Sequence, residues 1–139
     1  MVQYKTGNLL NAPVDYICHQ VNCQGRMGSG IAKQIKERWP VVYEEYIKRY
    51  VMYADCDDES LLLGNIQEVQ ISKTQSVINM FAQLNYGYDG RRYTSYDAFW
   101  ACLGEIRSFT PKGSKIGFSL WHRLRPRRRK LASHFYYDL

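Results

Sequence analysis

The sequence lacks the features that mark secreted and membrane proteins. It has only four cysteines, with no Cys-x-x-Cys pair among them, in 139 residues, which argues against a disulfide scaffold and favours reduced thiols. It has no apolar run of about 18 residues, the length that a membrane-spanning helix needs. Residues Met1 to Lys5 lack the apolar stretch of a secretion signal. These absences predict a cytoplasmic protein with no membrane partner.

The chain also has little excess charge outside its C-terminal end. The formal net charge is +6, but residues 119–139 contain six basic residues and one acidic residue, which leaves +1 for the other 118 residues. No glycine follows Gly117, although the chain has 10 glycines. Because 139 residues suffice for one hydrophobic core and not for two, we expect one domain over residues 1–118. Residues 119–139 are then an aberrant basic tail.

The hydrophobic pattern alternates between strands and helices. Helices are expected after Gly30, from Pro40, which ends one helix and can begin the next, and after a Thr94 or Ser95 cap. Strands are expected at residues 2–5, 15–22, 64–71 and 76–83, and from residue 115. This order predicts a three-layer α/β/α sandwich. Its sheet should be mixed and mostly parallel, with the strand at residues 15–22 inside it.

A glycine-rich loop follows the strand expected at residues 15–22. Gly25, Gly28 and Gly30 lie within six residues, between that strand and the next helix. Such loops can hold phosphate groups, because backbone N–H groups converge there and a helix N-terminus adds partial positive charge. The spacing is neither the dinucleotide fingerprint nor the nucleoside-triphosphate loop, since no Gly-Lys-Ser/Thr follows. Taken alone, the loop is equally compatible with a tight turn.

Several motifs together resemble the macrodomain family of ADP-ribose-binding proteins. They are Gly7-Asn8-Leu9-Leu10, His19-Gln20-Val21-Asn22-Cys23, the segment from Gly25 to Ala32, Val77-Ile78-Asn79-Met80-Phe81 and Tyr93-Thr94-Ser95-Tyr96-Asp97. The resemblance covers residues 1–118 and looks strongest to the branch of ADP-ribose 1″-phosphate phosphatases and related ADP-ribosyl hydrolases. It implies the α/β/α fold, ADP-ribose or a derivative as ligand, ADP-ribosylated macromolecules as partners, and no cofactor.

The resemblance also implies a role for each matched residue. Asn8 and Leu9 would face the adenine, although the family more often has an aspartate at the first of these positions. Asn22 would hold the distal ribose hydroxyls; the alternative is a turn residue that ends a strand. Phe81 would also belong to the ligand site. The first phosphate loop and the wall beside the distal ribose would comprise Gly25, Met27, Gly28, Ser29, Gly30, Ile31 and Ala32.

His19 is the candidate catalytic residue. A neutral imidazole there could act as a general base or orient a water molecule, and His19 matches a histidine proposed to be catalytic in the phosphatase branch. The alternative is a buried, hydrogen-bonded strand histidine. We expect no metal site, because Cys18 and His19 are neighbours that point to opposite faces of a strand. Another branch uses a lysine and an aspartate to release ADP-ribose, and Phe81-Ala82-Gln83 has no such lysine.

The resemblance ends at Phe118, where the family has a second glycine-rich phosphate loop and a helix. If one T is removed from the codons of Phe118 and Ser119, residues 118–131 can read Phe-Pro-Tyr-Gly-Ile-Gly-Cys-Gly-Leu-Ala-Gly-Gly-Asn-Trp. In this interpretation the arginines, whose codons can be CGN, arise because glycine codons (GGN) are read in the wrong frame. We therefore interpret residues 119–139 as a frame-shifted second phosphate loop. Weak or absent ADP-ribose binding and a poorly packed or disordered tail are expected.

Three functions remain open from the sequence. The first is a hydrolase of ADP-ribose 1″-phosphate or of an ADP-ribosylated protein or nucleic acid, impaired by the altered C-terminal segment. The second is a reader that binds ADP-ribose without turnover. The third is a basic nucleic-acid-binding protein that acts through residues 123–130, with stacking by Trp121, Phe135, Tyr136 and Tyr137.

Overall fold

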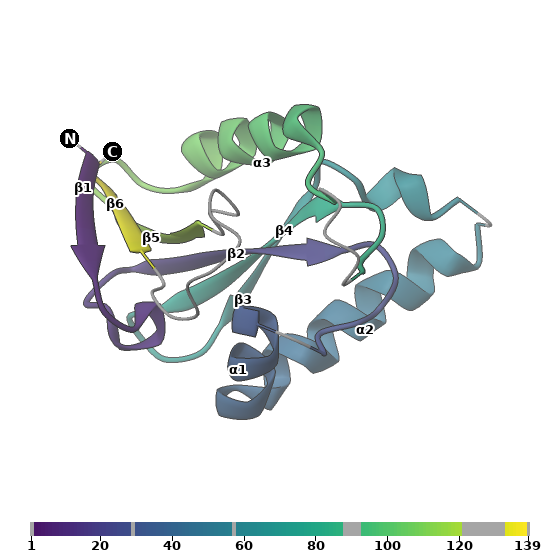
Figure 1. Ribbon diagram of the computed structural model, residues 1–139, viewed down its shortest axis with the longest axis horizontal. Coiled ribbons are helices and arrows are strands. Elements are labelled where there is room, and N and C mark those ends of the chain that lie inside the picture. Colours follow the sequence, from purple (N-terminus) through teal and green to yellow (C-terminus); the bar gives the residue numbers. More distant parts are fainter. Residues whose placement is uncertain (1, 29, 57, 88–92, 121–132, 139) are drawn as a thin grey trace.

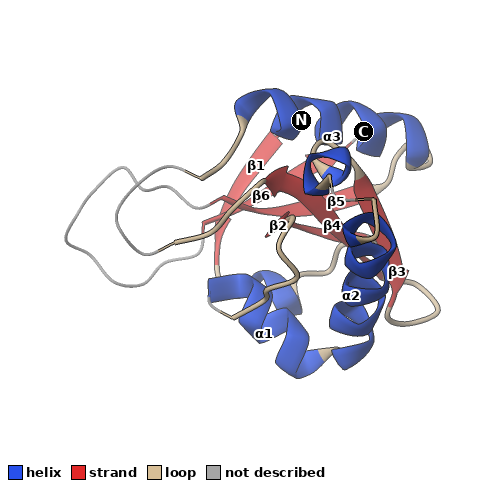
Figure 2. Ribbon diagram, turned by 90° about the vertical axis from the view of Figure 1, so that its right-hand side faces the viewer, coloured by secondary structure: helices blue, strands red, loops and turns tan. Residues whose placement is uncertain are grey.

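The computed structural model describes residues 2–28, 30–56, 58–87, 93–120 and 133–138. These residues form three layers, as predicted. Helices α1 (Gly30–Arg38) and α2 (Pro40–Ala54) cover one face of a sheet, and α3 (Tyr96–Phe109) covers the other (Figures 1 and 2). Two short 3-10 helices, η1 (Leu9–Asn11) and η2 (Glu59–Leu62), lie in the connections.

The described residues form a six-stranded mixed sheet in the order β1-β6-β5-β2-β4-β3. Its strands are β1 (Val2–Thr6), β2 (Tyr16–Asn22), β3 (Ile66–Gln70), β4 (Ser76–Gln83), β5 (Lys115–Leu120) and β6 (Ser133–Asp138). The interior position of β2 is confirmed. The mixed sheet is confirmed: β2 runs parallel to β4 and β5, whereas the pairs β3–β4, β5–β6 and β1–β6 are antiparallel. The segment between β3 and β4 is too short for a parallel crossover, which needs a dozen or more residues.

The C-terminal segment differs from the prediction. Ser119 and Leu120 complete β5, and β6 lies between β5 and β1 and pairs with both. A strand needs backbone partners and residues that favour extended structure, and the three aromatic residues of β6 satisfy the second condition. The expectation of a poorly packed or disordered tail is therefore wrong for the backbone of residues 133–138. Residues 121–132, with Trp121 and the arginines, lie outside the described residues, so the frame-shift interpretation stays a prediction.

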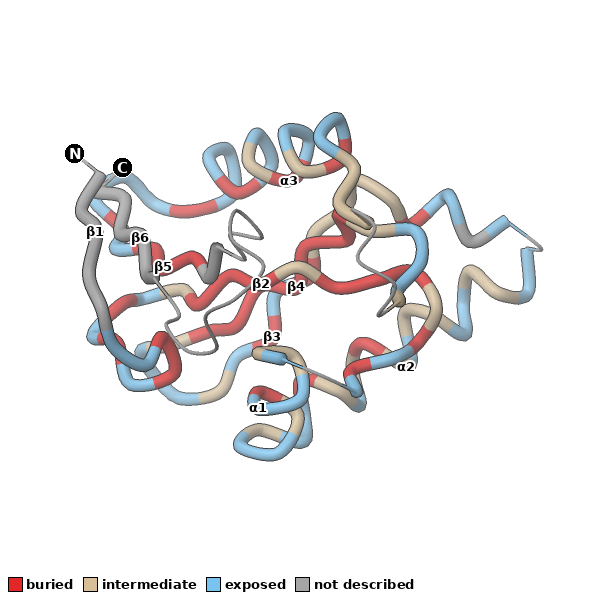
Figure 3. The backbone as a smooth tube through the Cα atoms, viewed as in Figure 1, coloured by how far each residue is buried: buried red, intermediate tan, exposed pale blue. Residues whose placement is uncertain are grey.

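The central strands β2 and β4 are largely buried (Figure 3), and apolar side chains pack on both faces of the sheet. Alternation along β2 sends Ile17 and Val21 toward α1 and α2, and Cys18 toward α3. Strand β4 is buried along nearly its whole length, because helices cover both of its faces. At the sheet edge, β3 alternates between buried and exposed positions instead.

The helix boundaries match the sequence signals. Pro40 is the first residue of α2, and the Ser95 side chain accepts a hydrogen bond from the backbone N–H of Ala98 at the start of α3. Because α1 follows β2 and α3 follows β4, the N-termini of both helices lie at the edge where these parallel strands end. Ligand sites of α/β folds lie at such edges. No helix among the described residues is long and apolar enough to cross a membrane.

Candidate functional site

The loop between β2 and α1 is shaped by the Asn22 side chain. Its Oδ1 accepts hydrogen bonds from the backbone N–H groups of Gln24 (3.0 Å) and Arg26 (3.3 Å), and its Nδ2 donates to the carbonyl oxygen of Arg26 (2.9 Å). These bonds close a turn at the carboxyl end of β2. Asn22 therefore acts as a turn residue, the alternative that the sequence left open, and its contact with ribose hydroxyls stays a prediction.

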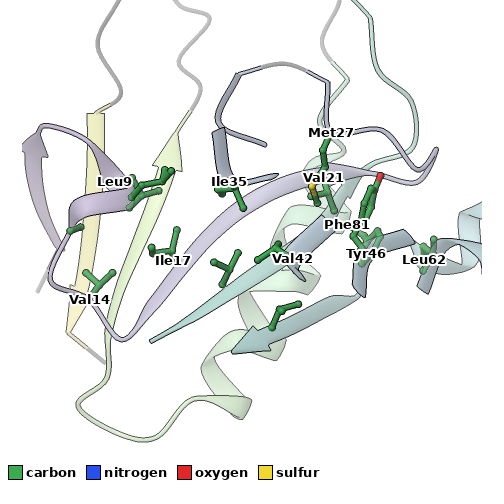
Figure 4. Close-up of a cluster of buried hydrophobic side chains, with 14 of the residues drawn as sticks. Leu9, Val14, Ile17, Val21, Met27, Ile35, Val42, Tyr46, Leu62 and Phe81 are labelled. Carbon is green, nitrogen blue, oxygen red and sulfur yellow. The ribbon is translucent and has the colours of Figure 1, made fainter. Parts of the chain in front are cut away.

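Tyr46 of α2 makes hydrogen bonds with both ends of this turn. Its hydroxyl lies 2.8 Å from both the carbonyl oxygen and Oδ1 of Asn22, and it accepts the backbone N–H of Arg26 at 3.1 Å. The ring is fully buried, and its centroid lies 5.8 Å from that of Phe81 (Figure 4). Burial raises the pKa of Tyr46 well above its usual value, so the hydroxyl stays protonated. The sequence pattern placed Tyr46 only on the apolar face of a helix and did not identify it as a site residue. Its hydroxyl group could have suggested this role, because a buried tyrosine hydroxyl usually has a hydrogen-bond partner.

The glycines of the loop have different roles. Gly25 has a φ of +74°, and a Cβ there would lie 2.8 Å from the Tyr50 ring, so this position requires glycine for the fold. Gly30 also has a positive φ, +59°, at the first residue of α1. A Cβ on Gly28 would meet nothing within 4 Å. The open space at Gly28, beside the N-terminus of α1, is therefore where an anionic group can approach the backbone.

The other predicted ligand residues divide into exposed and buried groups. Asn8 is exposed, and its side chain accepts the backbone N–H of Leu10 and caps η1. Leu9 and Phe81 are 0% exposed and form part of the core, so their contact with a ligand stays a prediction. Met27 is also buried, and Ile31 and Ala32 are half-buried against the same core. Ser29 lies outside the described residues.

His19 lies inside the protein, below the loop. Its side chain is 1% exposed, and Nε2 lies 2.5 Å from Oδ1 of Asn79 on β4. Burial lowers the pKa of His19 to about 4, although the hydrogen bond to Asn79 opposes this shift. At about 3.3 Å per residue along a strand, His19 lies about 10 Å from Asn22. This geometry fits the buried, hydrogen-bonded strand histidine, and the catalytic role stays a prediction.

The described residues outside the loop offer little else for catalysis. Within them, no group of three or more His, Cys, Asp or Glu residues could hold a metal ion. Two depressions lie away from the loop, one at the β3 edge between Arg49 and Glu105, the other near Asp15 and Ser114. The glycine loop at the end of β2 therefore remains the candidate site.

Comparisons with solved structures place this fold in one class of protein. No protein-family model matches the chain. A macrodomain protein from Streptomyces coelicolor is 27% identical with a TM-score of 0.60, over 73% of this chain and 66% of that one. The macrodomain of DarG from Mycobacterium tuberculosis is 28% identical with a TM-score of 0.57, over 76% and 67% of the two chains. The chain has the macrodomain fold, as its motifs predicted.

Two DNA ADP-ribosyl glycohydrolases match shorter segments of this chain at higher sequence identity. The chain is 44% identical over 66 residues to a DNA ADP-ribosyl glycohydrolase of Thermus aquaticus. The matched segment covers 48% of this chain and 17% of that protein. The chain is also 44% identical over 48 residues to the DNA ADP-ribosyl glycohydrolase of Mycobacterium tuberculosis. This second match covers 34% of this chain and 14% of that protein. The matched segments thus span about one-sixth or less of these relatives. The predicted placement in the phosphatase branch is not tested by these similarities.

Proposed function

We propose that this chain binds ADP-ribose at the loop from Asn22 to Gly30 and derives from a hydrolase of ADP-ribose derivatives. The observation that carries the proposal is the open backbone at Gly28. Gly28 lies between the turn that the Asn22 and Tyr46 hydrogen bonds close and the first residue of α1. The chain's similarity to DNA ADP-ribosyl glycohydrolases supports the choice of ligand.

The loop suits a diphosphate for electrostatic reasons. The first N–H groups of α1 lack carbonyl partners within the helix, and the helix dipole adds partial positive charge at the same end. Arg26, whose side chain is exposed, brings a full positive charge to the loop. We expect the diphosphate to lie over Gly28, with Asn22 at the ribose end and Asn8 toward the adenine, as the family resemblance implies.

Turnover is a separate question from binding. The loop sequence from Asn22 to Gly30 contains no Asp, Glu, His or Lys that could act as a general base, and His19 is buried. This composition favours the second candidate, a reader that binds ADP-ribose without hydrolysing it. ADP-ribosylated DNA is the macromolecular partner that the names of the relatives support.

A cytoplasmic location also remains a proposal. It is supported by the four cysteines, none of which forms a disulfide in the described part of the chain.

One assay separates the candidate functions. The full chain is incubated with an ADP-ribosylated oligonucleotide and, separately, with ADP-ribose 1″-phosphate. Release of ADP-ribose or of phosphate above the level of Gly28→Val would establish a hydrolase. Binding of the modified oligonucleotide without release would establish the reader. Equal, strongly salt-dependent binding of modified and unmodified oligonucleotides would instead support nucleic-acid binding through residues 123–130.

A further inference from the structure

A row of buried polar side chains crosses the sheet beneath α2. His19 on β2, Asn79 on β4 and Gln67 on β3 are register partners on adjacent strands, and they are 1%, 0% and 7% exposed. The His19 Nε2 lies 2.5 Å from Asn79 Oδ1, and Asn79 Nδ2 donates to Gln67 Oε1 at 3.1 Å. Gln67 Nε2 donates to the backbone carbonyl oxygen of Glu45 in α2 at 2.9 Å. The row therefore ends on a backbone group.

That backbone group fixes the direction of every bond in the row. A carbonyl oxygen only accepts hydrogen bonds, so the Gln67 amide must point its nitrogen at Glu45 and its oxygen at Asn79. The Asn79 amide must then donate to Gln67, which turns its own oxygen toward His19. An oxygen that only accepts requires a hydrogen on the His19 Nε2.

We infer that this relay holds His19 in the neutral Nε2–H tautomer and leaves its Nδ1 as a buried hydrogen-bond acceptor. Among the described residues, Nδ1 has no hydrogen-bond partner. A buried acceptor without a donor is unfavourable, so the site suits a single O–H donor. We expect this donor to be a buried water molecule or a hydroxyl of a bound ligand.

The tautomer limits what His19 can do. Its single proton is held by Asn79, so neutral His19 cannot serve as a general acid. A proton or a hydrogen bond can reach it only at Nδ1. Asn79 and Gln67 are therefore positioning residues for any role of His19. The inference goes beyond the proposed function and does not depend on it, because the ligand-free chain tests it.

Nuclear magnetic resonance of the full chain labelled with nitrogen-15 provides the test. Two-bond proton–nitrogen correlations distinguish the two neutral imidazole tautomers, and the His19→Phe spectrum assigns the His19 signals among the three histidines. At pH 7.5 we expect a protonated Nε2 and an unprotonated Nδ1. A protonated Nδ1, or a charged ring, would overturn the inference.

Two substitutions at Asn79 test whether the relay sets the tautomer. Asn79→Asp keeps an acceptor and should keep the Nε2–H pattern, whereas Asn79→Leu should increase the fraction with hydrogen on Nδ1. Gln70→Leu, at an exposed position of β3, is the matched control and should leave the His19 signals unchanged. Loss of the Nε2–H pattern in Asn79→Asp would contradict the relay even if Asn79→Leu failed to fold.

Addition of ADP-ribose identifies the source of the donor. A shift of the His19 Nδ1 resonance in step with saturation assigns the donor to a ligand hydroxyl. An Nδ1 resonance that already shows a hydrogen bond and does not move assigns it to a water molecule. An Nδ1 resonance typical of an unbonded nitrogen under both conditions would contradict the donor site.

Discussion

The hydroxyl group of Tyr46 lies 2.8 Å from the carbonyl oxygen of Asn22 and 2.8 Å from its side-chain oxygen. This relationship joins the middle of α2 to the carboxyl end of β2. Because the same hydroxyl also accepts the backbone N–H of Arg26, α2 determines the shape of the loop that carries the proposed phosphate site.

Removal of this hydroxyl should destabilise the protein. In Tyr46→Phe, buried polar groups of Asn22 and Arg26 lose a partner, and we expect the free energy of unfolding to fall by about 1–3 kcal/mol. Urea denaturation measures this change. Tyr43→Phe, at a half-buried tyrosine of the same helix, is the control and should change stability by less than about 0.5 kcal/mol. Equal stability of Tyr46→Phe and the unchanged chain would contradict this role.

Substitutions at two glycines should separate fold from binding. Gly25→Ala forces a side chain into a positive φ and against the Tyr50 ring, and should cost about 1–3 kcal/mol of stability. Gly28→Ala adds a methyl group in open space and should change stability by less than about 0.5 kcal/mol. Urea denaturation of both variants checks the difference. A large loss of stability in Gly28→Ala would show that its surroundings are not open.

The buried His19 should make stability depend on pH. Its pKa is about 4 in the folded protein, against the ordinary value of 6.5 for an exposed histidine. Between these values the unfolded chain binds a proton that the folded chain does not, so stability falls as pH drops from about 6.5 to about 4. The full loss is on the order of 3 kcal/mol.

The His19→Leu variant isolates this contribution from that of the carboxyl groups. Urea denaturation at several pH values should give a shallower slope for the variant than for the unchanged chain within this window. Parallel slopes would show that His19 is protonated in the folded protein or does not contribute.

The C-terminal interpretation makes a prediction about the gene. Codons 118–131 should give the glycine-rich motif when read in the neighbouring frame, and nucleotide sequencing decides this directly. A chain carrying that motif in place of residues 119–131 should bind ADP-ribose at least about tenfold more tightly, which corresponds to about 1.4 kcal/mol, because it regains a second set of backbone N–H groups for the diphosphate. Codons that cannot produce the motif would end the interpretation.

The sequence predicted the parts of this protein that depend on local signals. The apolar spacing, Pro40 and Ser95 located the helices, and the glycine motif located the loop. Sheet direction depended on connection length and on the pairing of distant strands, so the antiparallel β3 and the position of β6 were missed. The same limit applies to the site, because the contact between Asn22 and Tyr46 and the row through His19 require elements that are remote in sequence to come into register.

Calorimetric titration of the full chain with ADP-ribose tests the central claim most directly. We predict saturable, weak binding that Gly28→Val abolishes, because its side chain would block approach of the diphosphate to the backbone. Gly104→Val, at another glycine with open space around it, should bind like the unchanged chain. No binding by the unchanged chain, or equal binding by Gly28→Val, would contradict an ADP-ribose site at this loop.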